Sequence, residues 1–147
     1  MNITEHFTLE ELCHTDTGID NTPTQEIVGN LTVLAIDILE PTRTAWGSIK
    51  VNCAYRSDAV NKAVGGVTGS EHSLGKAADI KPLNVPLEEV YDWITKNIRF
   101  GQCILEDKNG IKWIHVSLPR ENKPNNESLV ARLVDGKMKY EPYDGIA

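Results

Sequence analysis

The chain has 147 residues, a formal net charge of −6 at pH 7 and 24% charged residues. This length is enough for one domain with its own hydrophobic core, so we expect a single domain over residues 1–147. An acidic chain without basic runs is poorly suited to sequence-independent nucleic-acid binding, which neutralises phosphates with Lys and Arg. We therefore expect no nucleic-acid partner.

Signals for secretion and membrane insertion are missing from this sequence. The N-terminal stretch MNITEHFTLEEL has no basic start and no continuous apolar segment, and no run approaches the ~20 apolar residues that span a bilayer. Cys13, Cys53 and Cys103 are widely spaced, which is typical of free thiols in a reducing compartment. We expect cytoplasmic synthesis without a signal peptide, no membrane partner, a monomer, and buried, inert thiols at Cys53 and Cys103.

The first part of the chain predicts helices. Residues Thr8 to Glu11 form a capping box, which predicts a short helix over residues 9–14. The stretch TPTQ predicts a second helix start with Thr22 as the N-cap. Apolar residues at helical spacing over 27–39 extend this core helix, and Pro41 should kink or split it.

The later part of the chain predicts mainly strands. Ser57 and Pro86 each open one further helix. The expected strands cover residues 49–53, 77–81, 102–106, 112–118, 129–134 and 137–140. Asn109-Gly110 and Asp135-Gly136 are turn signals that join the last four strands into two hairpins. Because helices come early and strands cluster late, we expect an α+β fold with helices packed on a mostly antiparallel sheet.

A candidate metal site begins in the stretch SEHSLGKAADI. Asp79 lies in an apolar strand, where a carboxylate is costly unless it is paired or bound to a metal. Gly75 and the alanines at 77–78 leave little bulk between His72 and Asp79, and His115 supplies a second histidine. The ordinary alternative is a surface histidine, a strand-end aspartate and a core histidine. Two imidazoles and one carboxylate, however, make a three-ligand zinc set with one open position.

Two motifs carry a resemblance to a known family. The pattern SxHxxGxAxD over Ser70 to Asp79, with WxHxS over Trp113 to Ser117, resembles the zinc D-Ala-D-Ala carboxypeptidase family of metallopeptidases. It is most similar to the small single-domain members of bacteriophage and bacterial genomes, and the stretch from Tyr55 to Gly66 is similar to their YRS…N…VGG segment. The resemblance covers about residues 7–118 and leaves 119–147 as a loop and a C-terminal hairpin.

The resemblance implies a fold shared with the hedgehog signalling domain and one Zn²⁺ per chain, bound by His72, Asp79 and His115. Some members carry a Glu three residues before the last zinc histidine, but this chain has Lys112 there. We expect Glu106 to be the catalytic base instead. A two-residue turn at Asn109-Gly110 places Glu106 opposite Trp113, on the same face as His115; a solvent-facing strand end is the alternative.

The resemblance also implies substrate-binding residues. Arg56 would bind a substrate carboxylate, because a guanidinium can donate two parallel hydrogen bonds to that group. Ser70 would add a hydrogen bond to the same carboxylate. A surface position is the alternative for Arg56, and we expect Trp113 to be a packing residue.

Together these residues predict a zinc metallopeptidase that cleaves peptidoglycan stem peptides. The bond would be cut by D-Ala-D-Ala carboxypeptidase or endolysin-type endopeptidase action, with Glu106 taking a proton from the attacking water. We expect a phage or prophage protein that reaches the cell wall after release or by assisted export. The alternative function is a non-catalytic, zinc-containing module that binds a wall fragment or a protein.

Overall fold

The computed structural model describes residues 1–143. In chain order, its elements are α1 (Leu9–Leu12), α2 (Gln25–Leu34), the π-helical turn η1 (Ala35–Leu39), α3 (Glu40–Trp46), β1 (Ile49–Cys53), α4 (Asp58–Ala63), the 3₁₀ turn η2 (Glu71–Leu74), β2 (Ala77–Pro82), α5 (Leu87–Asn97), β3 (Gln102–Lys108), β4 (Ile111–Ser117), β5 (Glu127–Val134) and β6 (Lys137–Pro142). Within the described residues, none of the helices has the length and apolar character needed to cross a membrane.

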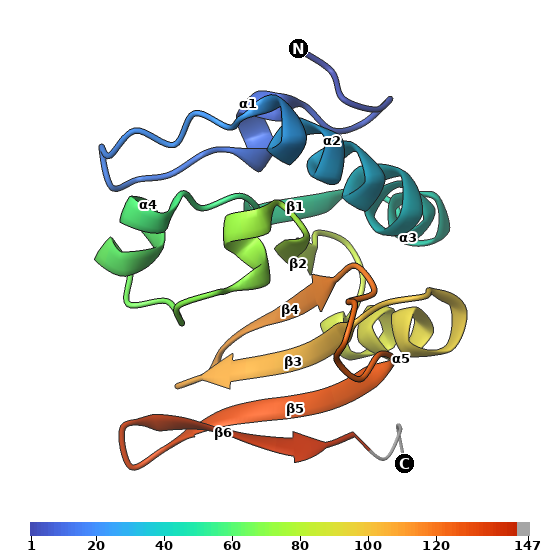
Figure 1. The fold of residues 1–147 in the computed structure, drawn as a ribbon. Helices are drawn as coiled ribbons and strands as arrows, with labels where there is room; N and C mark the ends of the chain where they lie inside the picture. Colours follow the sequence, from blue (N-terminus) through green and yellow to red (C-terminus); the bar gives the residue numbers. More distant parts are fainter. Residues whose placement is uncertain (144–147) are drawn as a thin grey trace.

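The six strands form one sheet in the order β1-β2-β4-β3-β5-β6 (Figure 1). All neighbours are antiparallel except β3 and β5, which run parallel. The turns at Asn109-Gly110 and Asp135-Gly136 have positive φ at both residues, as two-residue hairpin turns require. The predicted α+β fold with a mostly antiparallel sheet is confirmed. The last four residues of the predicted C-terminal segment lie outside the described part of the chain.

The N-terminal helices follow the predicted caps with one exception. The Thr8 side chain accepts a hydrogen bond from the Glu11 N–H, as the capping box predicts. Thr22 is not the N-cap of α2, because its hydroxyl and its backbone N–H both donate to the Asp20 carboxylate. Thr24 takes over that role and accepts from the Ile27 N–H, so the helix begins two residues later than predicted.

Pro41 divides the long helix as its chemistry requires. Proline has no N–H to donate back along the helix, and its ring crowds the preceding turn. The chain passes through the π-helical turn η1 directly before α3, which carries Pro41 in its first turn. Gly47, with φ of 82°, then ends α3. The prediction that Pro41 interrupts this helix is confirmed.

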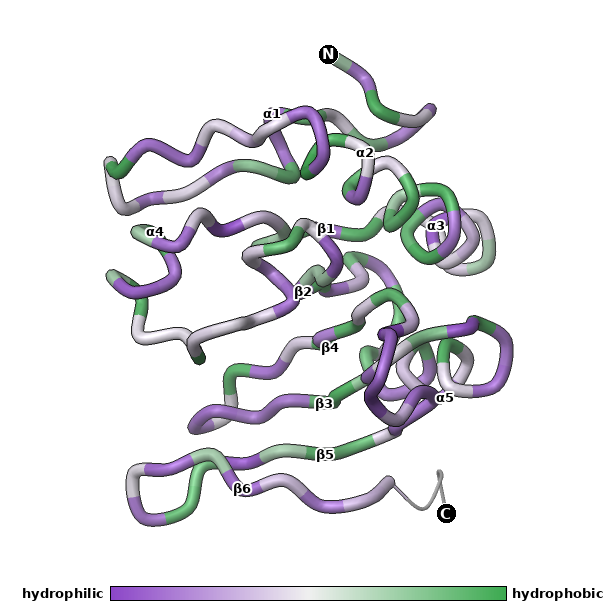
Figure 2. The backbone as a smooth tube through the Cα atoms, viewed as in Figure 1, coloured by the Kyte–Doolittle hydropathy of each residue, from purple (hydrophilic) through white to green (hydrophobic). Residues whose placement is uncertain are grey.

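One face of the sheet packs against the helices and forms the core. Its buried side chains come from α2, η1 and α5 and from alternate positions of the strands, such as Ile80, Ile114 and Val116. Residues between these positions point to the other face, because side chains alternate along a strand. Asp79 and His115 lie on that second face. At the sheet edge, β6 is mostly hydrophilic along its length (Figure 2).

Candidate metal centre

Three side chains from distant parts of the sequence meet on the second face of the sheet. Asp79 on β2 and His115 on β4 are register partners, so their side chains emerge next to each other. His115 Nδ1 lies 3.0 Å from Asp79 Oδ1, and His72 Nε2, from η2, lies 3.3 Å from the same oxygen. The structure therefore brings together the three residues that the sequence singled out.

The η2 turn holds His72 at this position. The Ser70 hydroxyl accepts a hydrogen bond from the His72 N–H at 3.2 Å and caps the turn, and Gly75 ends it with φ of 70°. A Cβ at Gly75 would lie 3.0 Å from Ile27 and 3.2 Å from Leu31 in α2. Gly75 thus lets the turn approach α2, and its role in leaving space between His72 and Asp79 stays a prediction.

Hydrogen bonding fixes which nitrogen of His72 faces the site. His72 Nδ1 lies 2.6 Å from the Ala54 carbonyl oxygen, and because a carbonyl only accepts, Nδ1 carries the proton. Nε2 therefore faces Asp79 Oδ1: when protonated it donates a hydrogen bond to this carboxylate, and when unprotonated its lone pair can bind a cation. Such a bond on the far nitrogen is typical of metal-binding histidines. The His72 side chain is 2% exposed, so this orientation is held inside the protein.

Asp79 is kept in its charged form. Burial by itself raises the pKa of this carboxyl group, but the positive charge of His72 and hydrogen bonds from both histidines outweigh burial. The pKa of Asp79 therefore lies well below its ordinary value. A carboxylate that stays ionised at all physiological pH values is a good partner for a cation.

The donor set fits zinc. One ring nitrogen of His72, one of His115 and a carboxylate oxygen of Asp79 all lie within 4.8 Å of one another. Two imidazoles and one carboxylate are a common catalytic zinc set, which leaves a position for water or substrate. Among residues 1–143, no further His, Cys, Asp or Glu joins this group.

Glu106 lies beside this centre, at the predicted register. It pairs with Trp113 across the β3–β4 hairpin, and the Trp113 indole N–H donates to Glu106 Oε2 at 2.8 Å. Burial, followed by the charge of Asp79, raises the pKa of Glu106, while His115 and the Trp113 hydrogen bond act in the opposite direction. The sequence predicted that Glu106 lies opposite Trp113, but this hydrogen bond, which follows from that register, was not predicted. Lys112 lies on the other face and pairs with Glu88.

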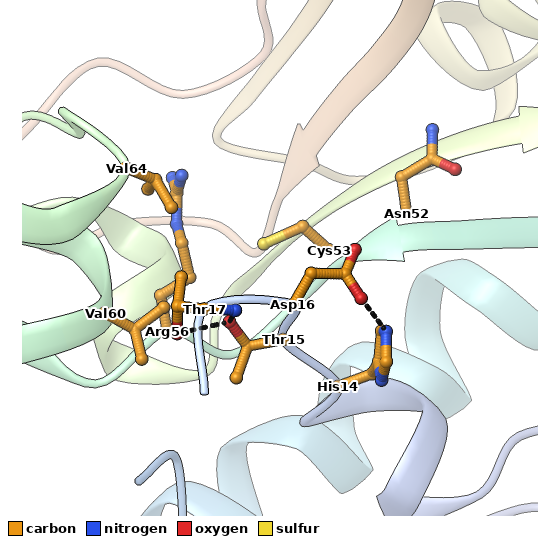
Figure 3. A pocket seen from close by; sticks show the side chains of 9 residues that line it. All are labelled: His14, Thr15, Asp16, Thr17, Asn52, Cys53, Arg56, Val60 and Val64. Atoms are coloured by element: carbon orange, nitrogen blue, oxygen red, sulfur yellow. Dashed lines mark hydrogen bonds and ion pairs between the residues drawn. The ribbon is translucent and has the colours of Figure 1, made fainter. Parts of the chain in front are cut away.

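A pocket of about 220 Å³ adjoins the metal centre without containing its three candidate ligands (Figure 3). Arg56 runs along one wall beside Val60 and Val64, and the sulfur of Cys53 points toward that side. The Arg56 backbone N–H donates to the His72 carbonyl at 3.1 Å. Its side-chain Nε is buried and has no hydrogen-bond partner among the described residues. Arg56 is thus built into the wall beside His72 and still has an unused donor.

Cys53 is closer to the centre than its sequence position indicated. It pairs with Asp79 across β1 and β2, and its sulfur lies 3.9 Å from His72 Nδ1. Burial and the charge of Asp79 raise the pKa of the Cys53 thiol to about 11, which keeps it protonated at neutral pH. A protonated thiol agrees with the inert cysteine expected at this position, but Cys53 is half-buried and not fully buried as predicted. Ser70 lies nearby as the cap of η2, and its contact with substrate stays a prediction.

Fold and site together define an α+β protein with three residues that could hold a metal ion and a carboxylate beside them. The family model for Peptidase M15 matches residues 5–117, and the chain belongs to this family. The family is of the zinc D-Ala-D-Ala carboxypeptidase type, as the sequence motifs predicted, and the chain is therefore a peptidase by family. No curated protein matches the chain.

Proposed function

We propose that this protein is a zinc peptidase that cleaves peptidoglycan stem peptides next to a D-amino acid. The observation that carries the proposal is the convergence of His72, Asp79 and His115 on one point, with Glu106 beside them. The charges of these three residues all act on the pKa of Glu106, so its carboxylate lies within their electrostatic reach. That arrangement suits hydrolysis, which needs a cation and a nearby base.

The residues of the site have separate roles in the proposed reaction. A zinc ion held by His72, Asp79 and His115 would supply Lewis acidity for the substrate carbonyl and for an attacking water. Glu106 accepts the proton of that water and delivers it to the leaving amine. A raised pKa helps Glu106 in both steps, because a base works best when its pKa is near the working pH. The Trp113 N–H orients the carboxylate.

The substrate is inferred from the family type and from Arg56. Arg56 is only partly buried and lines a pocket next to His72, and a guanidinium in that position suits a substrate carboxylate, which stem peptides carry. Ser70 would support the same group. Cleavage would follow a D-Ala-D-Ala carboxypeptidase or an endopeptidase course. We propose a monomer that is made in the cytoplasm and acts as an endolysin-like enzyme after release or assisted export.

A zinc-containing binding module is the rival function. A fourth protein ligand would close the coordination sphere and favour that role, but none joins the group within residues 1–143. A Glu106 side chain directed away from the metal would also favour it. Instead, the Trp113 indole holds Glu106 on the face that carries His115. These two observations favour hydrolysis.

Digestion of defined muropeptides tests the proposal. The purified protein is incubated with stem peptides of known length, and the products are weighed by mass spectrometry. We expect release of D-Ala or of peptide fragments, loss of this release on chelation, and its return with about one zinc per chain. Binding of the same peptides with no product in zinc-loaded protein would favour the rival function.

A further inference from the structure

The C-terminal hairpin extends the sheet on the side of Glu106. Glu106 on β3 pairs with Ala131 on β5, which pairs with Tyr140 on β6. Register partners point to the same face of a sheet, so Tyr140 lies on the face that carries the metal centre. Two strand spacings separate the backbones of Glu106 and Tyr140, which is roughly 10 Å. A tyrosine side chain can reach across much of that distance.

The surroundings of Tyr140 place its ring near the carboxylates. Ala131, between Tyr140 and Glu106, is 2% exposed, and its small side chain leaves the space above β5 to its larger neighbours. Burial, and then the charges of Glu106 and Asp79, raise the pKa of Tyr140, so the phenol lies within the field of both. Tyr140 nevertheless remains 51% exposed, so part of its side chain is open to contact with a ligand.

The second tyrosine of this segment, Tyr143, is held by an aromatic contact and a side-chain hydrogen bond, and within residues 1–143 Tyr140 has neither. Tyr143 lies on the helix-covered face, where its ring packs edge-on against Tyr91 of α5 at a centroid distance of 4.6 Å. Its hydroxyl donates to Asp92 at 2.7 Å. Tyr140 faces the other way, toward the candidate active site.

Tyr140 and Arg56 flank the metal centre from opposite sides. Arg56 follows β1 at one end of the sheet, β6 forms the other end, and Asp79 and His115 lie on strands between them (Figure 1). We infer that Tyr140 binds the half of the peptide substrate that lies across the scissile bond from the half held by Arg56. The ring packs on an apolar part of the peptide, and the O–H donates to a backbone carbonyl.

This inference rests on the proposed function and adds a substrate preference to it. Tyr140 lies beyond residue 117, where the family match ends, so this binding site belongs to the C-terminal hairpin of the chain. Peptides that extend past Glu106 toward β6 gain the Tyr140 contact, whereas short peptides do not. The enzyme should therefore prefer longer stem peptides to the minimal dipeptide.

The test compares three variants on two series of stem peptides, shortened from the amino end or from the carboxyl end. For Tyr140→Ala we expect KM of the full-length peptide to rise about tenfold while kcat changes less than about twofold. Tyr140→Phe keeps the ring and should raise KM about threefold. Lys139→Ala, an exposed position on the opposite face of β6, is the matched control. In the series that is shortened from the end bound by Tyr140, the difference in KM between Tyr140→Ala and the wild type should disappear once the peptide is too short to reach Tyr140.

Two outcomes separate this inference from the proposed function. If the wild type cleaves the peptides and Tyr140→Ala has the KM of Lys139→Ala, Tyr140 is not a binding residue, and the peptidase assignment stands. If the wild type shows no turnover, calorimetry with zinc-loaded protein decides. Weaker peptide binding by Tyr140→Ala than by Lys139→Ala supports the inference, and equal binding or no binding overturns it.

Discussion

The corner formed by η2, β2 and β4 and the β3–β4 hairpin beside it shift the pKa of their carboxylates in opposite directions. In the first region, two histidines hold Asp79 ionised and push its pKa below the ordinary value in spite of burial. In the second, burial and the charge of Asp79 raise the pKa of Glu106. Two carboxylates on one sheet face are thus tuned in opposite directions.

This difference in pKa indicates which carboxylate is suited to bind a cation and which is suited to transfer a proton. An aspartate that stays charged is suited to a cation, and a glutamate that holds its proton more tightly is suited to proton transfer. The hydrogen bonds agree with this division. Asp79 is approached by two imidazoles, whereas Glu106 accepts from the Trp113 indole, which orients it without supplying a full charge.

Asp79→Asn should have the largest effect. It removes the one negative charge of the donor set while keeping the side-chain shape, so zinc affinity should fall by more than about 100-fold. Competition with a chromophoric chelator measures this affinity. Asp135→Asn in the β5–β6 turn is the matched control, because Asn tolerates the positive φ found there. Equal zinc affinity in both variants would remove Asp79 from the metal centre.

Glu106→Gln should separate metal binding from turnover. We expect zinc content to stay at the wild-type value and kcat to fall by about 10²- to 10⁴-fold, the usual effect of losing a general base. Metal analysis and steady-state kinetics on one protein batch measure both. Glu141→Gln, on the exposed edge strand β6, should leave both values unchanged. Wild-type turnover in Glu106→Gln would show that another group is the base.

Trp113→Phe should change the pH dependence of the reaction. The indole hydrogen bond lowers the pKa of Glu106, so its loss should raise that pKa and move the acid limb of the kcat/KM profile to higher pH. At neutral pH we expect kcat/KM to fall about tenfold. Trp93→Phe, a half-buried tryptophan on α5, is the control. An unchanged acid limb would mean that Trp113 only packs.

The smallest effect concerns the stability of the metal-free protein. Because folding raises the pKa of Glu106, ionised Glu106 destabilises the folded state at pH values above that folded pKa. Below the pKa of the unfolded chain, about 4.3, the side chain is protonated in both states and this penalty disappears. Glu106→Gln should therefore raise Tm at pH 7 by up to about 2 °C and leave it unchanged at pH 3.5. A lower Tm at pH 7 would contradict the burial argument.

Local sequence signals predicted several features of the site correctly. Asn109-Gly110 set the register that places Glu106 opposite Trp113, because only a narrow set of turns joins two strands through two residues. The SxHxxGxAxD and WxHxS patterns selected the three residues that converge. The capping box at Thr8 also formed as predicted. Each of these signals acts over a few residues, where backbone sterics and hydrogen bonding leave few choices.

Tertiary structure decided the rest. The pairing of β2 with β4, which sets Asp79 beside His115 across 36 residues of chain, depends on which faces of the sheet the helices bury. The same packing brings Gly75 against α2 and turns the Trp113 N–H toward Glu106. It also adds β5 in parallel to β3, which places Tyr140 on the face of the metal centre. Side-chain identities alone determined which groups were available for catalysis, and long-range burial of apolar surface determined which of them meet.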